Sequence, residues 1–252
     1  SPSIQRTPVL FQAGASPRGL KFATRHAEAM FIGGDSTEKL KKQVDSIREL
    51  ARLDGRDDQA LKLFAGITVV TAETDELAQE KLKEYVKYAS SEAGLAHLSS
   101  SVGIDFSQYA DDDVIPYQQT NSIVSVNDRF KEQKVTLGDL KAQHLLGGRY
   151  PLFVGSGTTV AEQLIELIDA TGLDGFNLTR TVAPESHHDF IRLVIPELQQ
   201  RGRYKTEYES GSLRHKIFQK GHHLPATHPA DQFRCQSSLS SIEHEDQTKQ
   251  SA

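Results

Sequence analysis

A glycine-bounded turn near the start of the chain has the residue types that hold a phosphate group. The stretch Gly14–Gly19 reads GASPRG and follows a short apolar run at Val9–Gln12. Ser16 is a typical N-cap, and Pro17 is a typical first residue of a helix. A strand that turns into a helix here presents free backbone N–H groups at the helix N-terminus, where the helix dipole also favours an anion. Ser16 would add a hydroxyl donor, and Arg18 would add a positive charge.

The pattern leaves two interpretations of this turn open. In the first it binds a phosphate dianion, and Gly14 lets the backbone come close to the ligand. In the second it is an ordinary strand–helix turn, because glycine and serine are common in such turns. It is not a nucleotide P-loop, because no Gly-Lys-Ser/Thr follows, and it is not a GxGxxG fingerprint.

Other residues with chemical potential give weaker signals. The histidine pairs at 187–188 and 222–223 resemble metal ligands, but adjacent residues on a helix point in different directions, so we expect no metal site. Arg25 and His26 favour capping of a helix end over catalysis. The run Asp111–Asp113 favours a solvated acidic loop over a cation site. No serine–histidine–acid triad or carboxylate pair follows from spacing alone.

The composition argues against several classes of partner. The chain has 252 residues and a formal net charge of −5, which disfavours nonspecific binding to nucleic acid. Its apolar runs are shorter than the ~18–20 residues of a membrane span, so we expect no membrane insertion. With Cys235 as the single cysteine and no secretory signal pattern, a reducing cytoplasmic location is expected. Because the chain starts at Ser1 and its single methionine is Met30, we expect it to be part of something longer.

Short strands alternate with amphipathic helices along the chain. Four apolar runs predict strands, each followed by a helix: Val9–Gln12, Ala29–Ile32, Leu63–Val70 and Asp174–Leu178. Gly66, inside the third run, indicates a bulge or a close backbone approach. Pro151–Val154 is a short extended piece, followed by a helix that Thr159 and Glu162 would cap. Ser186 is expected to cap a last helix, and Pro196 to kink or split it.

This alternation predicts an α/β fold with a parallel sheet. An open doubly wound sheet usually has more strands, whereas a (β/α)8 barrel needs eight and typically ~250 residues. Four strand–helix units therefore match about half of a TIM barrel, with a long insertion at about 90–133 that contains two short helical stretches. We expect one domain over 1–230 and a disordered polar tail over 231–252.

Three blocks of sequence resemble the luciferase-like flavin-dependent monooxygenases. The block SPSIQRTPVLFQAGASPRGLKFATRHAEAMFIG (1–33) resembles their strand-five to strand-six region, in the branch that contains nitrilotriacetate and dibenzothiophene-sulfone monooxygenases. FVGSGTTVAEQLIEL (153–167) resembles their glycine-then-capped-helix segment. LDGFNLT with HHDFIRLVIPELQQRG (173–202) resembles their last strand and closing helix. The resemblance covers roughly residues 1–230.

The resemblance implies a function and a site. It implies the C-terminal half of a TIM barrel that uses reduced FMN, delivered by a separate flavin reductase, and O2 to oxygenate a small organic substrate. It places the FMN phosphate at Gly14, Ala15 and Ser16, and it leaves the catalytic residues unknown, in an N-terminal half. It also implies that the 90–133 insertion affects substrate choice, and we expect a homo-oligomer.

Two other functions remain open. The chain could be a non-catalytic half-barrel remnant that acts, if at all, through oligomerisation, because half a barrel exposes parallel sheet edges. It could also belong to a TIM-barrel enzyme that binds another phosphorylated ligand at the same turn. Flavin uptake and turnover with a reductase distinguish these possibilities.

Overall fold

The computed structural model describes residues 3–14, 16–116, 134–146 and 150–233, so Ala15 and the ranges 1–2, 117–133, 147–149 and 234–252 lie outside the described residues. The chain forms two compact units. One comprises Val9–Ser210, and the other joins Ser1–Pro8 to Gly211–Ala252.

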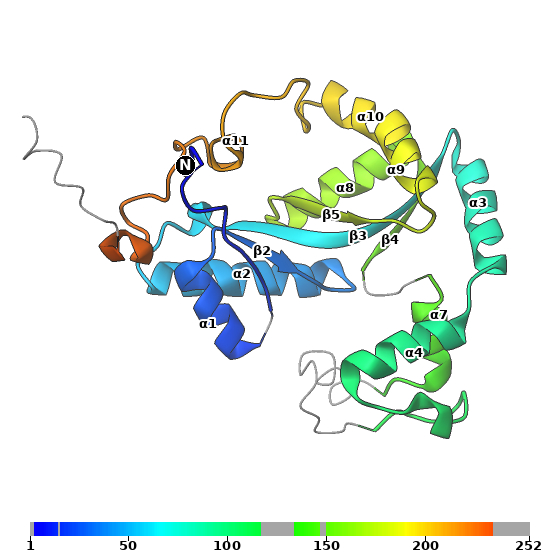
Figure 1. Ribbon diagram of the computed structural model, residues 1–252. Helices are drawn as coiled ribbons and strands as arrows, with labels where there is room; N and C mark the ends of the chain where they lie inside the picture. The colour runs from blue at the N-terminus through cyan, green and yellow to red at the C-terminus, as the bar shows by residue number, and fades with distance from the viewer. Residues whose placement is uncertain (1–2, 15, 117–133, 147–149, 234–252) are drawn as a thin grey trace, which may run out of the picture. The chain divides into compact units, whose positions relative to one another are not determined.

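The larger unit carries strands and helices in alternation (Figure 1). Its regular elements are β1 Phe11–Ala13, α1 Pro17–His26, β2 Ala29–Ile32, α2 Thr37–Leu53, β3 Lys62–Ala72, α3 Asp75–Lys87, α4 Ser91–Val102, α7 Leu137–His144, β4 Leu152–Ser156, α8 Gly157–Thr171, β5 Gly175–Thr179, α9 Glu185–Asp189 and α10 Ile195–Gln200. Short 3-10 turns lie at Asp58–Ala60 and Phe106–Gln108, and a π-helical turn lies at Phe190–Val194.

β3 is the central strand of a parallel five-stranded sheet. Phe64 pairs with Phe31 of β2 and with Gly175 of β5, so β2 and β5 lie on opposite edges of β3. Thr68 pairs with both β4 and β5, which places β4 on the edge that β2 occupies further back along β3. The parallel α/β fold predicted from the sequence is confirmed, but the sheet has five strands, because the extended piece before Gly155 also joins it.

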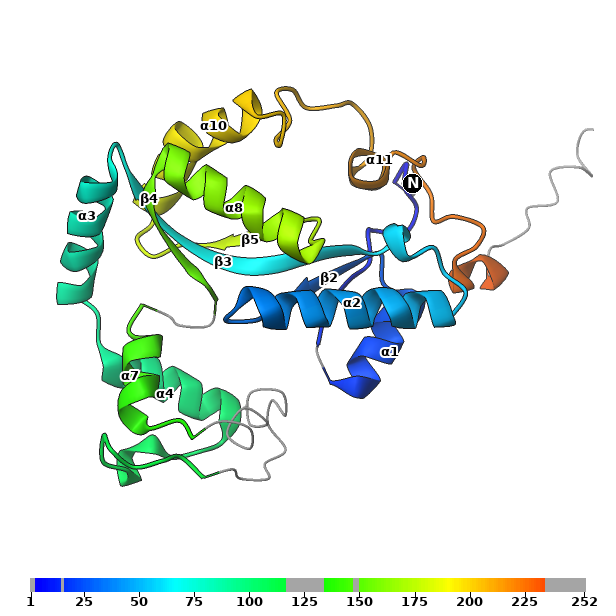
Figure 2. The ribbon, with the colours of Figure 1, turned by 180° about the vertical axis from the view of Figure 1, so that it is seen from behind.

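The helix-covered face of the sheet holds the hydrophobic core. Alternate side chains of β2 and β3, including Met30, Leu63 and Ile67, are buried against α2, α8 and α10. The helices α2 and α8 lie side by side, as Figure 2 shows from behind. Burying these long apolar side chains stabilises the sheet by roughly 1.5–3 kcal/mol for each one.

The predicted helix ends are confirmed in part. Gly172 ends α8 in the left-handed conformation, with φ of 75°, and Gly202 follows α10 with φ of 66°. The start of α8 was predicted wrongly, because Ser156 rather than Thr159 accepts the capping hydrogen bond, from the Thr159 N–H. Ser186 does not cap its helix either, since its hydroxyl accepts bonds from the N–H groups of the preceding loop.

The insertion has a core of its own. α4 and α7 lie side by side, and apolar side chains from both, with Ile115 and Val135, form a cluster separate from those under the sheet. Thr136 and Asp139 form a capping box at the start of α7. The described residues from α4 to α7 therefore form a folded lobe, which extends past the expected bounds of 90–133 to His144.

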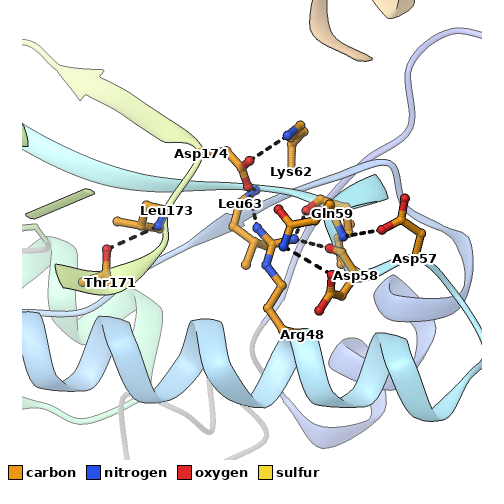
Figure 3. Close-up of polar contacts among 10 residues, drawn as sticks. Arg48, Asp57, Asp58, Gln59, Lys62, Leu63, Thr171, Leu173 and Asp174 are labelled. Atoms are coloured by element: carbon orange, nitrogen blue, oxygen red, sulfur yellow. Dashed lines mark hydrogen bonds and ion pairs between the residues drawn. The ribbon is translucent and has the colours of Figure 1, made fainter. Parts of the chain in front are cut away.

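A buried ion cluster ties α2 to the strands of the sheet (Figure 3). Asp174, just before β5, accepts hydrogen bonds from Arg48 Nη2 at 2.7 Å, Lys62 Nζ at 2.8 Å and the Leu63 N–H at 2.9 Å. Arg48 also donates to the carbonyl of Leu61 at 2.5 Å. These groups lie at the amino ends of β3 and β5, the end of a barrel that serves stability rather than catalysis.

The smaller unit is held together by a buried arginine. Arg214, in α11 (Leu213–Phe218), is 2% exposed and donates to the carbonyls of Gln5, Thr7 and Pro8 at 3.0–3.2 Å and to that of His222 at 2.9 Å. One guanidinium thus satisfies backbone groups from both ends of the chain. A short 3-10 helix, Pro229–Phe233, follows.

Candidate functional site

The turn between β1 and α1 has the cap that its sequence predicts. Ser16 is the N-cap, and its Oγ accepts a hydrogen bond from the Gly19 N–H at 3.1 Å. Its carbonyl accepts one from the Leu20 N–H at 2.8 Å, which starts the helix. Pro17 occupies the first helical position, where its missing N–H costs nothing.

The described part of this turn is open. Ser16, Pro17 and Arg18 are exposed, and a Cβ added at Gly14 would meet only the Gln12 side-chain nitrogen, at 3.6 Å, which is an ordinary contact. The Arg18 backbone N–H, the Ser16 hydroxyl hydrogen and the Arg18 guanidinium have no hydrogen-bond partner among the described residues. All three are donors, which suits a phosphate dianion. Ala15 lies outside the described residues.

A second strand–helix turn, between β4 and α8, shows what an anion does in such a place in this chain. Its N-terminus is filled by Asp75, whose carboxylate accepts hydrogen bonds from the Ser156 N–H at 2.7 Å and the Thr159 hydroxyl at 3.1 Å. The bond from the Ser156 N–H, and then that from Thr159, lowers the pKa of Asp75 below its ordinary value. The N–H and hydroxyl donors of the turn between β4 and α8 are therefore bonded by a carboxylate of the chain itself. Among the described residues, no carboxylate takes this place at the turn at Ser16.

The turn at Ser16 lies at the carboxyl end of its strand. In barrels built from parallel strands, ligand and active sites lie at that end. Gly33 and Gly34 follow β2, whose Phe31 pairs with Ala13, the last residue of β1. The turn and the end of β2 are therefore neighbours at one rim of the sheet.

Three phenylalanines that were not singled out from the sequence line the face of the sheet opposite the helices. Phe11, Phe31 and Phe64 share this face by register, and the Phe11 and Phe31 ring centroids lie 5.2 Å apart. Phe11 and Phe31 are still 41% and 40% exposed. The alternation of side chains along β1 and β2 was the signal that would have identified them. A surface of this kind is typical of a contact site.

A tyrosine also lies on this face, over the glycine inside β3. A Cβ at Gly66 would overlap Cδ1 and Cε1 of the Tyr150 ring and lie 2.6 Å from its Cζ, so no other residue fits under the ring as it is placed. The close approach predicted at Gly66 is confirmed. Tyr150 was not identified as its cause, because the two residues are far apart in the chain.

A cavity of about 620 Å³ lies elsewhere in the larger unit. It is lined by Asp35–Thr37, Pro151–Val154 and residues of α8. Its lining includes neither the turn at Ser16 nor Tyr150, and its acidic residues suit an anion poorly. We therefore place the candidate site by the donors at Ser16 rather than by cavity size.

The remaining sequence candidates do not form a second site. Among the described residues, no group of three histidine, cysteine or acidic side chains is placed to hold a metal ion. In the acidic run, Asp111 pairs with Lys141 at 2.6 Å. At the C-terminus of α1, Arg56 donates hydrogen bonds to the backbone carbonyls of Thr24 at 2.6 Å and Ala27 at 2.9 Å. No helix in the described ranges is both long enough and apolar enough to cross a membrane.

Known proteins resemble this chain over most of its length. It is 42% identical to a long-chain alkane monooxygenase of Geobacillus thermodenitrificans over 92% of this chain and 50% of that one. The crystal structure of DmoA from Hyphomicrobium sulfonivorans is 40% identical, with a TM-score of 0.81, over 93% of this chain and 50% of the other. A riboflavin lyase solved with modified FMN and riboflavin is 36% identical, with a TM-score of 0.84, over 92% and 52% of the two chains.

The branch named from the sequence is also among the relatives. A dibenzothiophene-sulfone monooxygenase of Rhodococcus erythropolis is 31% identical over 84% of this chain, and nitrilotriacetate monooxygenase component A of Aminobacter aminovorans is 30% identical over 83%. The chain spans about half the length of the curated relatives it matches. The sequence profile of the luciferase-like monooxygenases matches residues 1–175. Sequence and fold together show that this chain belongs to the luciferase-like monooxygenase family, of whose barrel it makes up about half.

Proposed function

We propose that this chain holds the phosphate of FMN at Gly14, Ala15 and Ser16, as part of a flavin-dependent monooxygenase. In this proposal the protein uses reduced FMN and O2 to oxygenate a small organic substrate. The observation that carries it is the contrast between two strand–helix turns, one filled by Asp75 and one open at Ser16. A relative solved with modified FMN supports flavin as the ligand.

The residues of the turn fit the terminal phosphate of FMN. Its charge would sit at the N-terminus of α1, where the helix dipole favours an anion by typically 0.3–1 kcal/mol. The Arg18 N–H and the Ser16 hydroxyl donate to its oxygens, and the small Gly14 lets the phosphate approach the backbone. When bound, reduced FMN supplies the electrons that activate O2, and the protein's part is to fix its position and exclude water.

The insertion is the proposed source of substrate choice. It folds around its own core, so it can vary without disturbing the sheet. Relatives that differ in substrate by name, a long-chain alkane monooxygenase and a dimethyl-sulfide monooxygenase, support a small organic substrate without naming this one.

A separate flavin reductase is the proposed partner. Two relatives bear names that describe parts of larger systems: one is component A of nitrilotriacetate monooxygenase, and the other is one of the subunits of pristinamycin IIA synthase. These names support a system with more than one protein. Such a reductase would act in the cytoplasm, where reduced nicotinamide cofactors are available.

Titration of the full-length protein with FMN tests the proposal. We expect saturable binding that Ser16→Ala and Gly14→Val both weaken, because one removes a donor and the other fills the space of the phosphate. We also expect oxygenated product when a flavin reductase and its nicotinamide donor are added. Binding that neither substitution changes would refute the phosphate site.

A second function is favoured by the open face of the sheet. The exposed Phe11 and Phe31 indicate a surface that another protein segment covers. A half-barrel remnant that pairs with itself would use this face and have no need of flavin. A homo-oligomer in gel filtration that never takes up flavin would support the remnant, and a flavin-loaded assembly that turns over would exclude it.

A further inference from the structure

The ring of Tyr150 lies over β3 where the strand pairing on one edge is interrupted. On that edge β2 pairs with Lys62–Ala65 and β4 pairs with Thr68–Ala72, which leaves Gly66 and Ile67 between them. Tyr150 comes just before β4, and its ring covers Gly66 on the face that carries Phe64 and Thr68. The ring is so close that a Cβ at Gly66 would overlap Cδ1 and Cε1 and lie 2.6 Å from Cζ.

Measured along the strand direction, the ring of Tyr150 lies at about the same level of the sheet as the candidate site. Gly33 follows β2, and a Cβ there would lie 3.8 Å from Cε1 of Tyr150. Gly33 is two residues beyond Phe31, which pairs with the last residue of β1. Because neighbouring strands are about 4.8 Å apart, the phosphate turn and the ring are separated by roughly two strand spacings along one rim.

The hydroxyl of Tyr150 is available to a ligand. This hydroxyl makes no hydrogen bond to any other described residue. It is also not a fully buried polar atom, so a ligand can reach it. A tyrosine hydroxyl at the edge of a site can both donate and accept. Because Gly66 has no side chain, the ring can lie directly against β3.

We infer that Tyr150 contacts the flavin beyond its phosphate, through a hydrogen bond from or to its hydroxyl. The inference rests on the proposed function, because it needs FMN with its phosphate at Ser16. An FMN anchored at Ser16 whose ribityl chain followed this rim would reach Tyr150. Tyr150 is then a flavin-binding residue supplied by the segment that joins the insertion to β4.

Riboflavin, which lacks the phosphate, separates this contact from the phosphate site. Dissociation constants for FMN and riboflavin are measured by flavin fluorescence on the full-length protein, with Tyr150→Phe, Ser16→Ala and the control Tyr208→Phe, whose tyrosine is 79% exposed. Tyr150→Phe should weaken both flavins by the same factor, about threefold to tenfold, as the loss of one hydrogen bond predicts. Ser16→Ala should weaken FMN only, and the control should change neither.

The melting temperature separates binding from packing. Tyr150→Phe keeps the ring on Gly66, so the melting temperature of the free protein should not change. Unchanged affinity for both flavins in Tyr150→Phe would overturn the inference and leave the phosphate proposal intact if Ser16→Ala still weakens FMN. A loss of affinity that comes with an equal loss of thermal stability would also overturn it, because the hydroxyl would then serve the fold. A wild-type protein that binds neither flavin refutes the proposed function itself.

Discussion

The buried cluster around Asp174 gives a stability prediction that does not depend on any ligand. In Asp174→Ala, Arg48 Nη2 at 2.7 Å, Lys62 Nζ at 2.8 Å and the Leu63 N–H at 2.9 Å all lose their acceptor. The side chains of Arg48 and Asp174 are only 9% and 15% exposed, so water replaces the lost bonds poorly. Breaking a buried ion pair by removing one partner costs about 3–5 kcal/mol. Since Arg48 keeps its bond to Leu61, we expect a loss of about 3 kcal/mol, the lower end of that range.

Urea unfolding followed by circular dichroism measures this loss. With typical m-values in urea, a loss of about 3 kcal/mol lowers the midpoint by roughly 1–3 M. The matched control is Asp45→Ala, which breaks an exposed pair between Lys41 and a side chain that is 62% exposed. That pair is worth about 0.3–0.5 kcal/mol. Equal losses in the two variants would show that the cluster of Asp174 does not hold α2 to the sheet.

Single contacts give three further predictions. Gly66→Ala should cost about 1–3 kcal/mol in unfolding free energy, because its Cβ would overlap the Tyr150 ring, and adding Tyr150→Ala should cancel much of that steric penalty in a double-mutant cycle. Burial raises the pKa of Asp189, but the hydrogen bonds and positive charges of Lys81 and Arg192 together outweigh this effect, and the net pKa is lowered. The contribution of Asp189 to stability is therefore present above the unfolded pKa of about 3.9 and is lost as the pH falls through the lower folded value. The stability gap between wild type and Asp189→Asn should close below about pH 4 in acid titrations. Gly172→Ala should lower the unfolding free energy by about 1–2 kcal/mol, because φ there is 75°, and substitution by asparagine should cost less than by alanine.

Local sequence signals predicted the elements that depend on local physics. The run at Ala29–Ile32 became a strand with the same bounds, and Ser16 caps its helix, because both follow from neighbouring residues. The predictions that were wrong concern residues whose contacts are with distant parts of the sequence. The sequence pattern of Thr159 and Glu162 matches a capping box. In the structure, however, the Thr159 hydroxyl donates to Asp75, and Ser156 is the N-cap of α8.

The candidate site was predictable only in part. The turn at Ser16 could be found because its residues are contiguous. Tyr150 could not be found, because it is far from Gly66 in the sequence. A glycine inside a strand indicates that some group packs closely against it, but not which residue supplies that group. Alternation along β1 and β2 could have assigned the phenylalanines to one face of each strand, but their stacking depends on the pairing of β1 with β2, which no local pattern provides.

The ratio of the affinities for FMN and riboflavin tests the phosphate site most directly. It is measured on the full-length protein for wild type, Ser16→Ala and Ser90→Ala, which removes an equivalent cap with a 3.1 Å hydrogen bond at the start of α4. We predict that wild type prefers FMN, that Ser16→Ala reduces this preference by about tenfold, as the loss of one charge-assisted hydrogen bond implies, and that Ser90→Ala leaves it unchanged. A wild-type protein that binds the two flavins equally, or a preference that survives Ser16→Ala intact, would contradict the account.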